Sequence, residues 1–250
     1  TGPQNNSPMP SARIFNYEKG HWKFSQKLEA DELGTHSGFS EAIATNGSIT
    51  AVGCPEASKT GVVRVYDNSQ GKLVHKATLR PPQNSTTIAF GCSVSVSSNI
   101  IAVGSQEKVY LFQETNYDWE IIEDFRVESQ DSEPTVKVSI HGNYLAVGLT
   151  TPSSGTLQIY RMARTRWNLY QEFNSTELGV RQLGSSLAMD SNHLVVGGVG
   201  SVAVLKRQKA TWEFNQILYP PRPSDSFGES LGIDNSFIVV GASSEGNQAS

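Results

Sequence analysis

The sequence predicts an all-β protein, a β-propeller built from four-stranded antiparallel blades, and three observations lead to this prediction. A fifteen-residue segment occurs five times along the 250 residues. A second segment, rich in aromatic residues, alternates with it, and each of the two segments has the pattern of a two-stranded hairpin. Two hairpins in each period give four strands, which is the content of one propeller blade.

The first segment is clearest at residues 90–104 and 227–241, which read FGCSVSVSSNIIAVG and FGESLGIDNSFIVVG. The copies at 39–53 and 183–197 also fit well, whereas the copy at 134–148 fits in its second half only. Each copy closes on a glycine, and these glycines lie 44 to 51 residues apart, a spacing that fits blades better than helical repeats. The closing glycines are Gly53, Gly104, Gly148, Gly197 and Gly241.

Each copy of this segment has two halves with different patterns. The first half alternates small or polar residues with apolar ones, which predicts a half-buried strand, and the second is a nearly continuous apolar run, which predicts a strand covered on both faces. An asparagine stands at or beside the turn between them in every copy, and we interpret it as a turn residue because asparagine tolerates the left-handed conformation. These asparagines are Asn46, Asn99, Asn143, Asn192 and Asn235.

The second segment occurs at 12–28, 62–79, 108–125, 157–173 and 202–218. An apolar and aromatic strand is followed by a polar turn, usually a tryptophan, and a second alternating strand. All four tryptophans occupy the same place, and Leu73 replaces the fifth. A row of tryptophans could stack on sugars, but we interpret these as blade-packing anchors, because aromatic side chains bury the largest area per residue. The anchors are Trp22, Trp119, Trp167 and Trp212.

The order of the segments predicts how the propeller closes. The chain begins with a hairpin of the second kind and ends with one of the first kind, and unpaired strand edges favour pairing these two halves with each other. The sequence therefore predicts one domain of five blades, the last a composite. The predicted parts are an N-terminal tail at 1–11, outer strands of the composite blade at 12–32, blades at 33–84, 85–130, 131–178 and 179–224, and its inner strands at 225–250. Two alternatives stay open: the chain is part of a seven-bladed propeller, or the half-blades pair between neighbouring molecules.

The motif F-G-x-S-V-x-V followed by V-G resembles the FG-GAP repeat, the blade unit of integrin α-subunit propellers and of many surface and secreted proteins. The resemblance spans roughly residues 12–242, with departures: Ser40 replaces the glycine of F-G in the first copy, and Pro134 and Thr135 replace both residues in the third. Integrin-type blades often hold calcium in a D-x-D/N-x-D-G-x-x-D loop. Here the turns are short and offer single carboxylates, Asp190 and Asp234, which are too few for calcium. We therefore expect no metal site and no cofactor.

The resemblance implies a non-enzymatic extracellular or cell-surface propeller that serves adhesion, protein interaction or assembly of a surface structure. The expected partners are a protein or glycan at the cell surface, or further copies of the chain in an oligomer or filament. One alternative is a glycan-binding lectin. Another is a glycoside hydrolase that uses Glu41 and Glu229, which occupy equivalent repeat positions and would be neighbours in a closed five-bladed ring. The five histidines occupy unlike positions, without the spacing of a zinc site.

Further features bear on the compartment. Cys54 ends one hairpin and Cys92 begins the equivalent hairpin of the next blade, so both are predicted on the same face of adjacent blades, where a disulfide could form. Buried free thiols are the alternative. The net charge of −4, with scattered basic residues, argues against nucleic acid, and no apolar run is long enough to span a membrane. The chain starts at Thr1, as a processed secreted protein would. The predicted glycosylation sites are Asn5, Asn46, Asn84 and Asn174.

Overall fold

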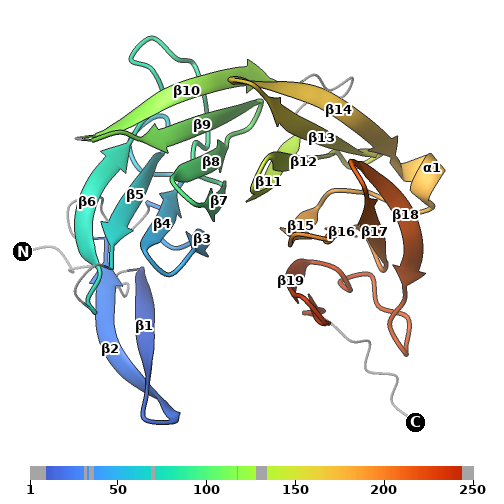
Figure 1. Cartoon of the computed structure of the whole chain (residues 1–250), viewed down its shortest axis with the longest axis horizontal. Coiled ribbons are helices and arrows are strands. Elements are labelled where there is room, and N and C mark those ends of the chain that lie inside the picture. Colours follow the sequence, from blue (N-terminus) through green and yellow to red (C-terminus); the bar gives the residue numbers. More distant parts are fainter. Residues whose placement is uncertain are drawn as a thin grey trace, which may run out of the picture.

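The computed structural model describes residues 10–30, 33, 37–68, 71–116, 118–127 and 134–243. Within these residues, twenty strands and one short helix form an open arc, with the first strand of each complete sheet toward the centre and the last at the rim (Figure 1). The predicted all-β propeller of four-stranded antiparallel blades is confirmed.

Four sheets are complete blades in which the strands follow one another in chain order. The first blade contains β3 (Ala42–Thr45), β4 (Ile49–Cys54), β5 (Val62–Asp67) and β6 (Val74–Leu79). The second contains β7 (Ser93–Ser97), β8 (Ile100–Gly104), β9 (Lys108–Glu114) and β10 (Trp119–Arg126). The third contains β11 (Thr135–His141), β12 (Tyr144–Thr150), β13 (Gly155–Ala163) and β14 (Arg166–Asn174), which is followed by α1 (Ser175–Leu178). The fourth contains β15 (Ser186–Met189), β16 (His193–Gly197), β17 (Val202–Gln208) and β18 (Thr211–Leu218). Each sheet lies inside one of the four predicted blade ranges.

The remaining strands form two separate hairpins at the ends of the arc. The N-terminal hairpin is β1 (Ser11–Glu18) and β2 (His21–Glu29), and the C-terminal hairpin is β19 (Ser230–Asp234) and β20 (Phe237–Gly241). The strand total is that of five blades, but the predicted pairing of these two hairpins with each other is not formed: they flank the opening of the arc (Figure 1).

Each terminal hairpin is held by the blade next to it. The Gln26 side chain of β2 exchanges two hydrogen bonds of 2.9 Å with the backbone of Leu73 in the first blade. At the other end, the Ser186 hydroxyl of the fourth blade donates a 2.5 Å hydrogen bond to the carbonyl of Gly228, just before β19. The arc therefore fixes the two hairpins on opposite sides of its opening.

The repeated F-G pair has a backbone role. Gly91 has a φ of 95°, a left-handed conformation that favours glycine, and its N–H donates a 3.0 Å hydrogen bond to the carbonyl of the closing glycine, Gly104. The same bond recurs from Gly184 to Gly197 and from Gly228 to Gly241. The glycine of this pair, which follows Leu183 instead of a phenylalanine in the copy at 183–197, thus joins the start of each such hairpin to its end.

The closing glycine is the point where neighbouring blades approach most closely. A Cβ placed on Gly53 would lie 2.0 Å from the carbonyl oxygen of Gly91 in the next blade, so only glycine fits there. The third copy lacks F-G, and the corresponding contact is looser, since a Cβ on Gly104 would lie 3.1 Å from the carbonyl oxygen of Val136. Packing between neighbouring units therefore requires glycine at Gly53, Gly148 and Gly197.

The alternating serines of β7 have a related function. Their hydroxyls accept hydrogen bonds from the free backbone N–H groups along the inner edge of β11 in the next blade. Three such bonds, each 3.0 Å long, join Val138 to Ser93, Ile140 to Ser95 and Gly142 to Ser97. We call these three bonds the serine ladder. It satisfies edge donors that would otherwise be unpaired.

The tryptophans fill the spaces between blades. Trp119, Trp167 and Trp212 are at most 7% exposed, and each packs in a core cluster with residues of the preceding blade, as the anchor interpretation requires. For Trp22 that interpretation is wrong in this structure, because its side chain is 70% exposed. It lies on the N-terminal hairpin, which has no preceding blade to cover it (Figure 1).

Candidate functional site

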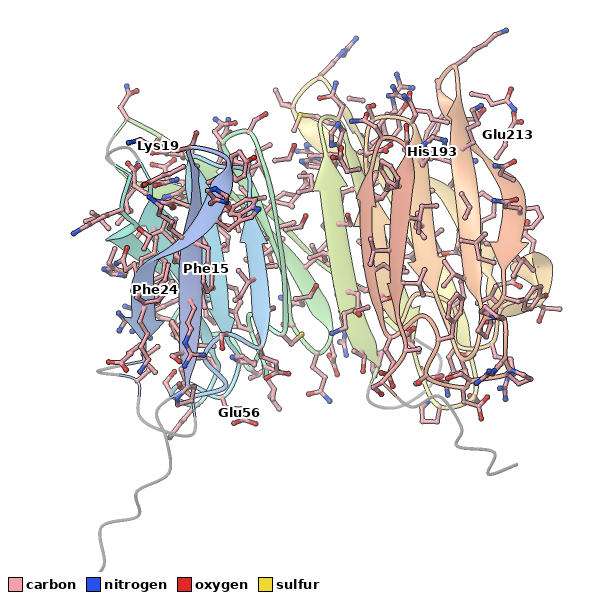
Figure 2. All side chains as sticks on the ribbon, turned by 90° about the horizontal axis from the view of Figure 1, so that it is seen from below. Phe15, Lys19, Phe24, Glu56, His193 and Glu213 are labelled. Atoms are coloured by element: carbon pink, nitrogen blue, oxygen red, sulfur yellow. The ribbon has the colours of Figure 1, made fainter. Side chains whose placement is uncertain are left out.

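A groove follows the edge of the disc along the third and fourth blades. Figure 2 separates the two faces: Lys19, His193 and Glu213 lie at one, and Glu56, in the loop between β4 and β5, at the other. The groove lies on the face of Glu56, because it is built from the equivalent β12–β13 loop and from the segments that connect blades.

Three adjoining hollows make up this groove, which we call the rim groove. The acidic hollow has a volume of about 720 Å³ and includes Glu172 and Glu177, and the middle hollow has about 460 Å³ and includes Ser153 and Gln182. The proline hollow has about 360 Å³ and includes Tyr219. The first two hollows share Ser175 and Thr176, and the last two share Gly179, Arg181 and Val199. The three hollows of the rim groove therefore adjoin one another in a row.

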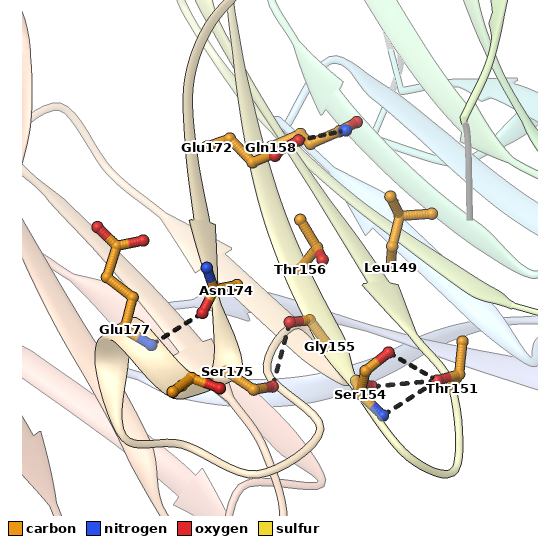
Figure 3. Close-up of a pocket in the computed structure, with 11 residues that line it drawn as sticks. Leu149, Thr151, Ser154, Gly155, Thr156, Gln158, Glu172, Asn174, Ser175 and Glu177 are labelled. Carbon is orange, nitrogen blue, oxygen red and sulfur yellow. Dashed lines mark hydrogen bonds between the residues drawn. The ribbon is translucent and has the colours of Figure 1, made fainter. Parts of the chain in front are cut away.

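The acidic hollow is lined mainly by polar groups (Figure 3). Two carboxylates, Glu172 and Glu177, face it from β14 and α1, and the Gln158 side chain donates a 2.7 Å hydrogen bond to Glu172. Thr151 and Ser154 add hydroxyl groups from the β12–β13 loop. Such a set can bind a cationic group through the carboxylates and hydrogen-bonding groups through the hydroxyls.

Local hydrogen bonds hold this wall of the rim groove in place. The side chain of Asn174 caps α1 by accepting a 2.9 Å hydrogen bond from the Glu177 N–H. The Ser175 hydroxyl donates to the carbonyl of Gly155 at 3.1 Å and accepts from the N–H of Leu183 at 3.2 Å. The side chains of the acidic hollow are therefore set on a fixed backbone.

The other end of the groove carries a positive charge beside apolar surface. The guanidinium of Arg181 lies 3.0 Å from the carboxylate of Asp225, and the two side chains are 73% and 87% exposed. An ion pair this exposed contributes little to stability, so Arg181 can exchange Asp225 for a carboxylate of a ligand. Tyr219, which is 67% exposed, and two prolines complete the proline hollow.

The structure does not bring Glu41 and Glu229 together as a catalytic pair. Glu41 precedes β3 and Glu229 precedes β19, in the blade and the hairpin at opposite ends of the chain. Each N–H bonds within its own turn, to Gly38 and to Ser226, and no hydrogen bond or ion pair joins the two side chains in the described part of the chain. Their proximity depended on closure of the ring, so the glycoside hydrolase alternative loses its basis.

The predicted disulfide is wrong: Cys54 and Cys92 are free thiols. Cys54 is fully buried in the core between the first blade and the N-terminal hairpin. The Cys92 thiol points the other way, toward the carbonyls of Gly104 and Val136 at 3.6 and 3.8 Å. The repeat positions predicted a shared face of the disc, but the two side chains lie at different blade interfaces.

These thiols predict a loss of stability at alkaline pH. Burial raises the pKa of Cys54 from 9.0 to about 12 and that of Cys92 from 9.0 to about 11. Above pH 9 the thiols of the unfolded chain ionise while those of the native protein stay protonated. The free energy of unfolding should therefore fall as the pH rises above 9, and should not depend on these thiols at lower pH. For Cys54 the slope is about 1.4 kcal/mol per pH unit. Urea unfolding between pH 8 and 11 should show a smaller slope for Cys54→Ala, and an unchanged slope would contradict the assignment.

The predicted glycosylation sites have different surroundings. The Asn46 amide nitrogen donates a 2.8 Å hydrogen bond to the carbonyl of Ser98 in the next blade, so a glycan on this nitrogen would lie at a contact between blades. Asn84 is exposed, Asn174 lines the acidic hollow, and Asn5 lies outside the described residues. Occupancy of these sites stays a prediction.

The turn carboxylates act within their turns. Asp190 accepts hydrogen bonds of 2.7 Å from the N–H groups of Asn192 and His193, and Asp234 accepts one from the Asn235 side chain. In the ranges that the structure describes, no three side chains of His, Cys, Asp or Glu gather as a metal site would require. No helix in these ranges has the length and apolar character needed to cross a membrane.

Sequence reasoning did not find the rim groove. Most of its residues come from loops and connecting segments outside the repeats, whereas Gln158 and Glu172 lie on strands inside the second segment. Of the groove residues, only Asn174 is among those predicted from the sequence, as a glycosylation site. The stretch YPPRPSD at 219–225 was the one available signal, because clustered prolines beside an aromatic residue often form an exposed binding surface.

No protein-family model matches the chain, and no curated protein matches it. Solved structures do match, among them candidate 6-phosphogluconolactonases from Bacteroides fragilis and Bacteroides uniformis. These are 16% and 14% identical to this chain, with TM-scores of 0.58 and 0.60, and each match covers 92% of this chain and 69% of the other. The WD40 domain of Toxoplasma gondii coronin is 13% identical with a TM-score of 0.51, and its match covers 74% of this chain and 45% of that one. The β-propeller domain of Myceliophteria thermophila Cps50 (Swd1) is 10% identical with a TM-score of 0.53, covering 88% and 83%.

These similarities establish the propeller fold alone. They overturn the predicted role as a cell-surface adhesion propeller, because the matching structures named above are candidate sugar-phosphate lactonases and propeller domains of a coronin and of Cps50, and none is an adhesion protein. The resemblance to the FG-GAP repeat and a location outside the cell stay predictions.

Proposed function

We propose that this protein is a binding propeller that holds an extended peptide segment of a partner protein in the rim groove. The observation that carries the proposal is the row of three adjoining hollows, acidic at one end and with an exposed arginine toward the other. Propellers display loops of different composition on a rigid disc, and the function of each lies in its own sites.

The groove chemistry defines the segment that would fit. Glu172 and Glu177 in the acidic hollow favour a lysine or arginine side chain, whereas Arg181 favours a carboxylate further along the segment. Tyr219 offers an aromatic face for a proline or another apolar residue. An extended chain suits the site because alternate side chains, which point to the same side, can then enter successive hollows.

Selection from a display library of random ten-residue peptides tests this proposal. We expect enrichment of peptides with a basic and an acidic residue at a fixed spacing. Glu172→Gln combined with Glu177→Gln should remove the basic preference and weaken binding at least tenfold, and Arg181→Ala should remove the acidic preference. The control is Glu213→Gln on the opposite face (Figure 2), which should bind as the wild type does. If no such peptides are enriched, or if both groove variants still enrich the same peptides, the groove does not bind peptides.

A second candidate is hydrolysis of a sugar-phosphate lactone, which is favoured only by the two candidate lactonases of similar fold. On our proposal, purified protein leaves the spontaneous hydrolysis rate of 6-phosphogluconolactone unchanged. A saturable increase in that rate would replace the binding proposal with an enzymatic one.

A further inference from the structure

We propose that the two terminal hairpins are halves of one blade that forms between two copies of this chain. The C-terminal hairpin of one copy supplies the two inner strands, and the N-terminal hairpin of the next copy supplies the two outer strands. This inference does not depend on the rim groove, which lies in complete blades.

The four complete blades define how these halves would pair. In each of them, the pairing of the third strand with the fourth shifts by one residue at a fixed point. The closing glycine of the second strand pairs with the third-strand residue that lies three positions before the residue at which this shift occurs. The pairs are Gly53 with Val63, Gly104 with Val109, Gly148 with Leu157 and Gly197 with Val202. The third strands shift register at Tyr66, Phe112, Tyr160 and Leu205.

The N-terminal hairpin has the same shift, between Ile14 and Phe15 of β1. Applying the common register pairs Gly241 of β20 with Ala12 of β1, and Ile238 with Phe15. The two hairpins therefore carry matching edges, although neither edge is paired with the other in this structure.

Side chains at the two ends of the arc are exposed where their equivalents are buried. Val239 is 68% exposed, whereas the residues at its position in the complete blades are all 0% exposed. Those residues are Ala51, Ala102, Ala146 and Val195. Phe15 is 50% exposed, against 3% for its equivalent Phe112. Figure 2, which views the molecule from its open side, shows Phe15 beside Phe24 on the N-terminal hairpin.

Joining two copies would cover both exposed surfaces at once. Trp22 and Phe15 of the second copy would pack on the fourth blade of the first copy, as Trp212 packs on the third blade. Val239 of the first copy would face the first blade of the second copy. Ile43 of that blade is 51% exposed, whereas its equivalent Val94 is 8% exposed.

A second copy fits these surfaces better than closure within one chain does. Closure would change the angle between blades, and contacts such as that of Gly53 with Gly91 leave no space for such a change. Joining head to tail changes no contact inside the chain, and a head-to-tail contact that does not close produces a helical filament.

Disulfide trapping tests the proposal in a Cys54→Ala, Cys92→Ala background. Directly opposite residues of antiparallel strands are close enough for a disulfide, so Phe15→Cys and Ile238→Cys should cross-link. When the two single variants are mixed and oxidised, we expect a covalent dimer, and the double variant should give a ladder of oligomers. Mixing Asn16→Cys with Ile238→Cys, a pair that is one residue out of register, should give at least tenfold less covalent dimer. Absence of the mixed dimer, or a double variant that links only within one chain, would overturn the proposal.

The solution mass gives an independent measurement that needs no cross-link. The mass of the wild type should rise above the 27.2 kDa of one chain as its concentration increases. Val239→Glu places a charge on the exposed surface without touching the buried core, and should keep the mass at one chain. A wild type that stays at one chain throughout, or a variant that associates equally well, would show that this surface does not join copies.

Discussion

Replacing Gly148 with alanine is expected to lower the free energy of unfolding by about 3 kcal/mol or more. The new Cβ would lie 2.2 Å from the carbonyl oxygen of Gly184 in the next blade and 2.8 Å from its Cα. Both atoms belong to backbone that the hydrogen bond from Gly184 to Gly197 holds in place. The third and fourth blades would have to separate, and urea unfolding followed by circular dichroism measures the cost.

Gly232→Ala is the matched control for this experiment. Gly232 also lies in a copy of the first segment, on β19, but a Cβ there would meet no heavy atom within 4 Å. We expect a change within about 0.5 kcal/mol, or a small gain, since alanine restricts the unfolded chain. Equal losses for the two variants would show that the closing glycine is not set by contact between blades.

Trp212→Ala is expected to cost about 3 to 5 kcal/mol, the range for removing a large buried aromatic side chain. Trp212 is 1% exposed and packs edge to face on Tyr144 of the preceding blade, with ring centroids 5.5 Å apart. Gln171 also exchanges hydrogen bonds of 2.7 and 2.9 Å with its backbone. The loss of this anchor should lower the urea midpoint of the whole domain.

The same substitution at Trp22 is the control, because Trp22 occupies the same repeat position with 70% of its surface exposed. At dilutions where the mass is that of one chain, Trp22→Ala should change stability by no more than about 0.5 kcal/mol. A large loss from Trp22→Ala would mean that its side chain is covered even in a single chain.

The fold could be predicted because each repeat carries its own pairing rules. Alternation, apolar runs and turn residues determine which strands pair within a blade, and the position of Trp212 showed that it would be buried. Whether the ring closes could not be predicted in the same way, since no local sequence pattern determines the angle between blades. Trp22 has the same sequence context as Trp212, and only the missing neighbour makes it exposed.

The sites were harder to predict, for two physical reasons. Repeat positions placed Cys54 and Cys92 on one face of the disc, but a strand also has two sides, and these determine which interface a thiol enters. Most residues of the rim groove, Arg181 among them, lie in connections that differ from blade to blade, so no periodic signal marks them. Glu172 lies on β14, and nothing in the repeat pattern distinguishes it from the other polar residues of that strand. Their proximity follows from the three-dimensional arrangement of the third and fourth blades.

The serine ladder has a consequence for how such a protein changes during evolution. Its bonds join short hydroxyl side chains to main-chain groups, and the glycine contacts beside it also involve main chain. Main-chain groups are present whatever the side chains of the adjoining blade. A duplicated second blade would therefore keep these bonds to its neighbour, whereas the tryptophan and apolar contacts between blades depend on the side chains that meet there. Duplication or deletion of a genetic unit about 45 residues long would lengthen or shorten the arc.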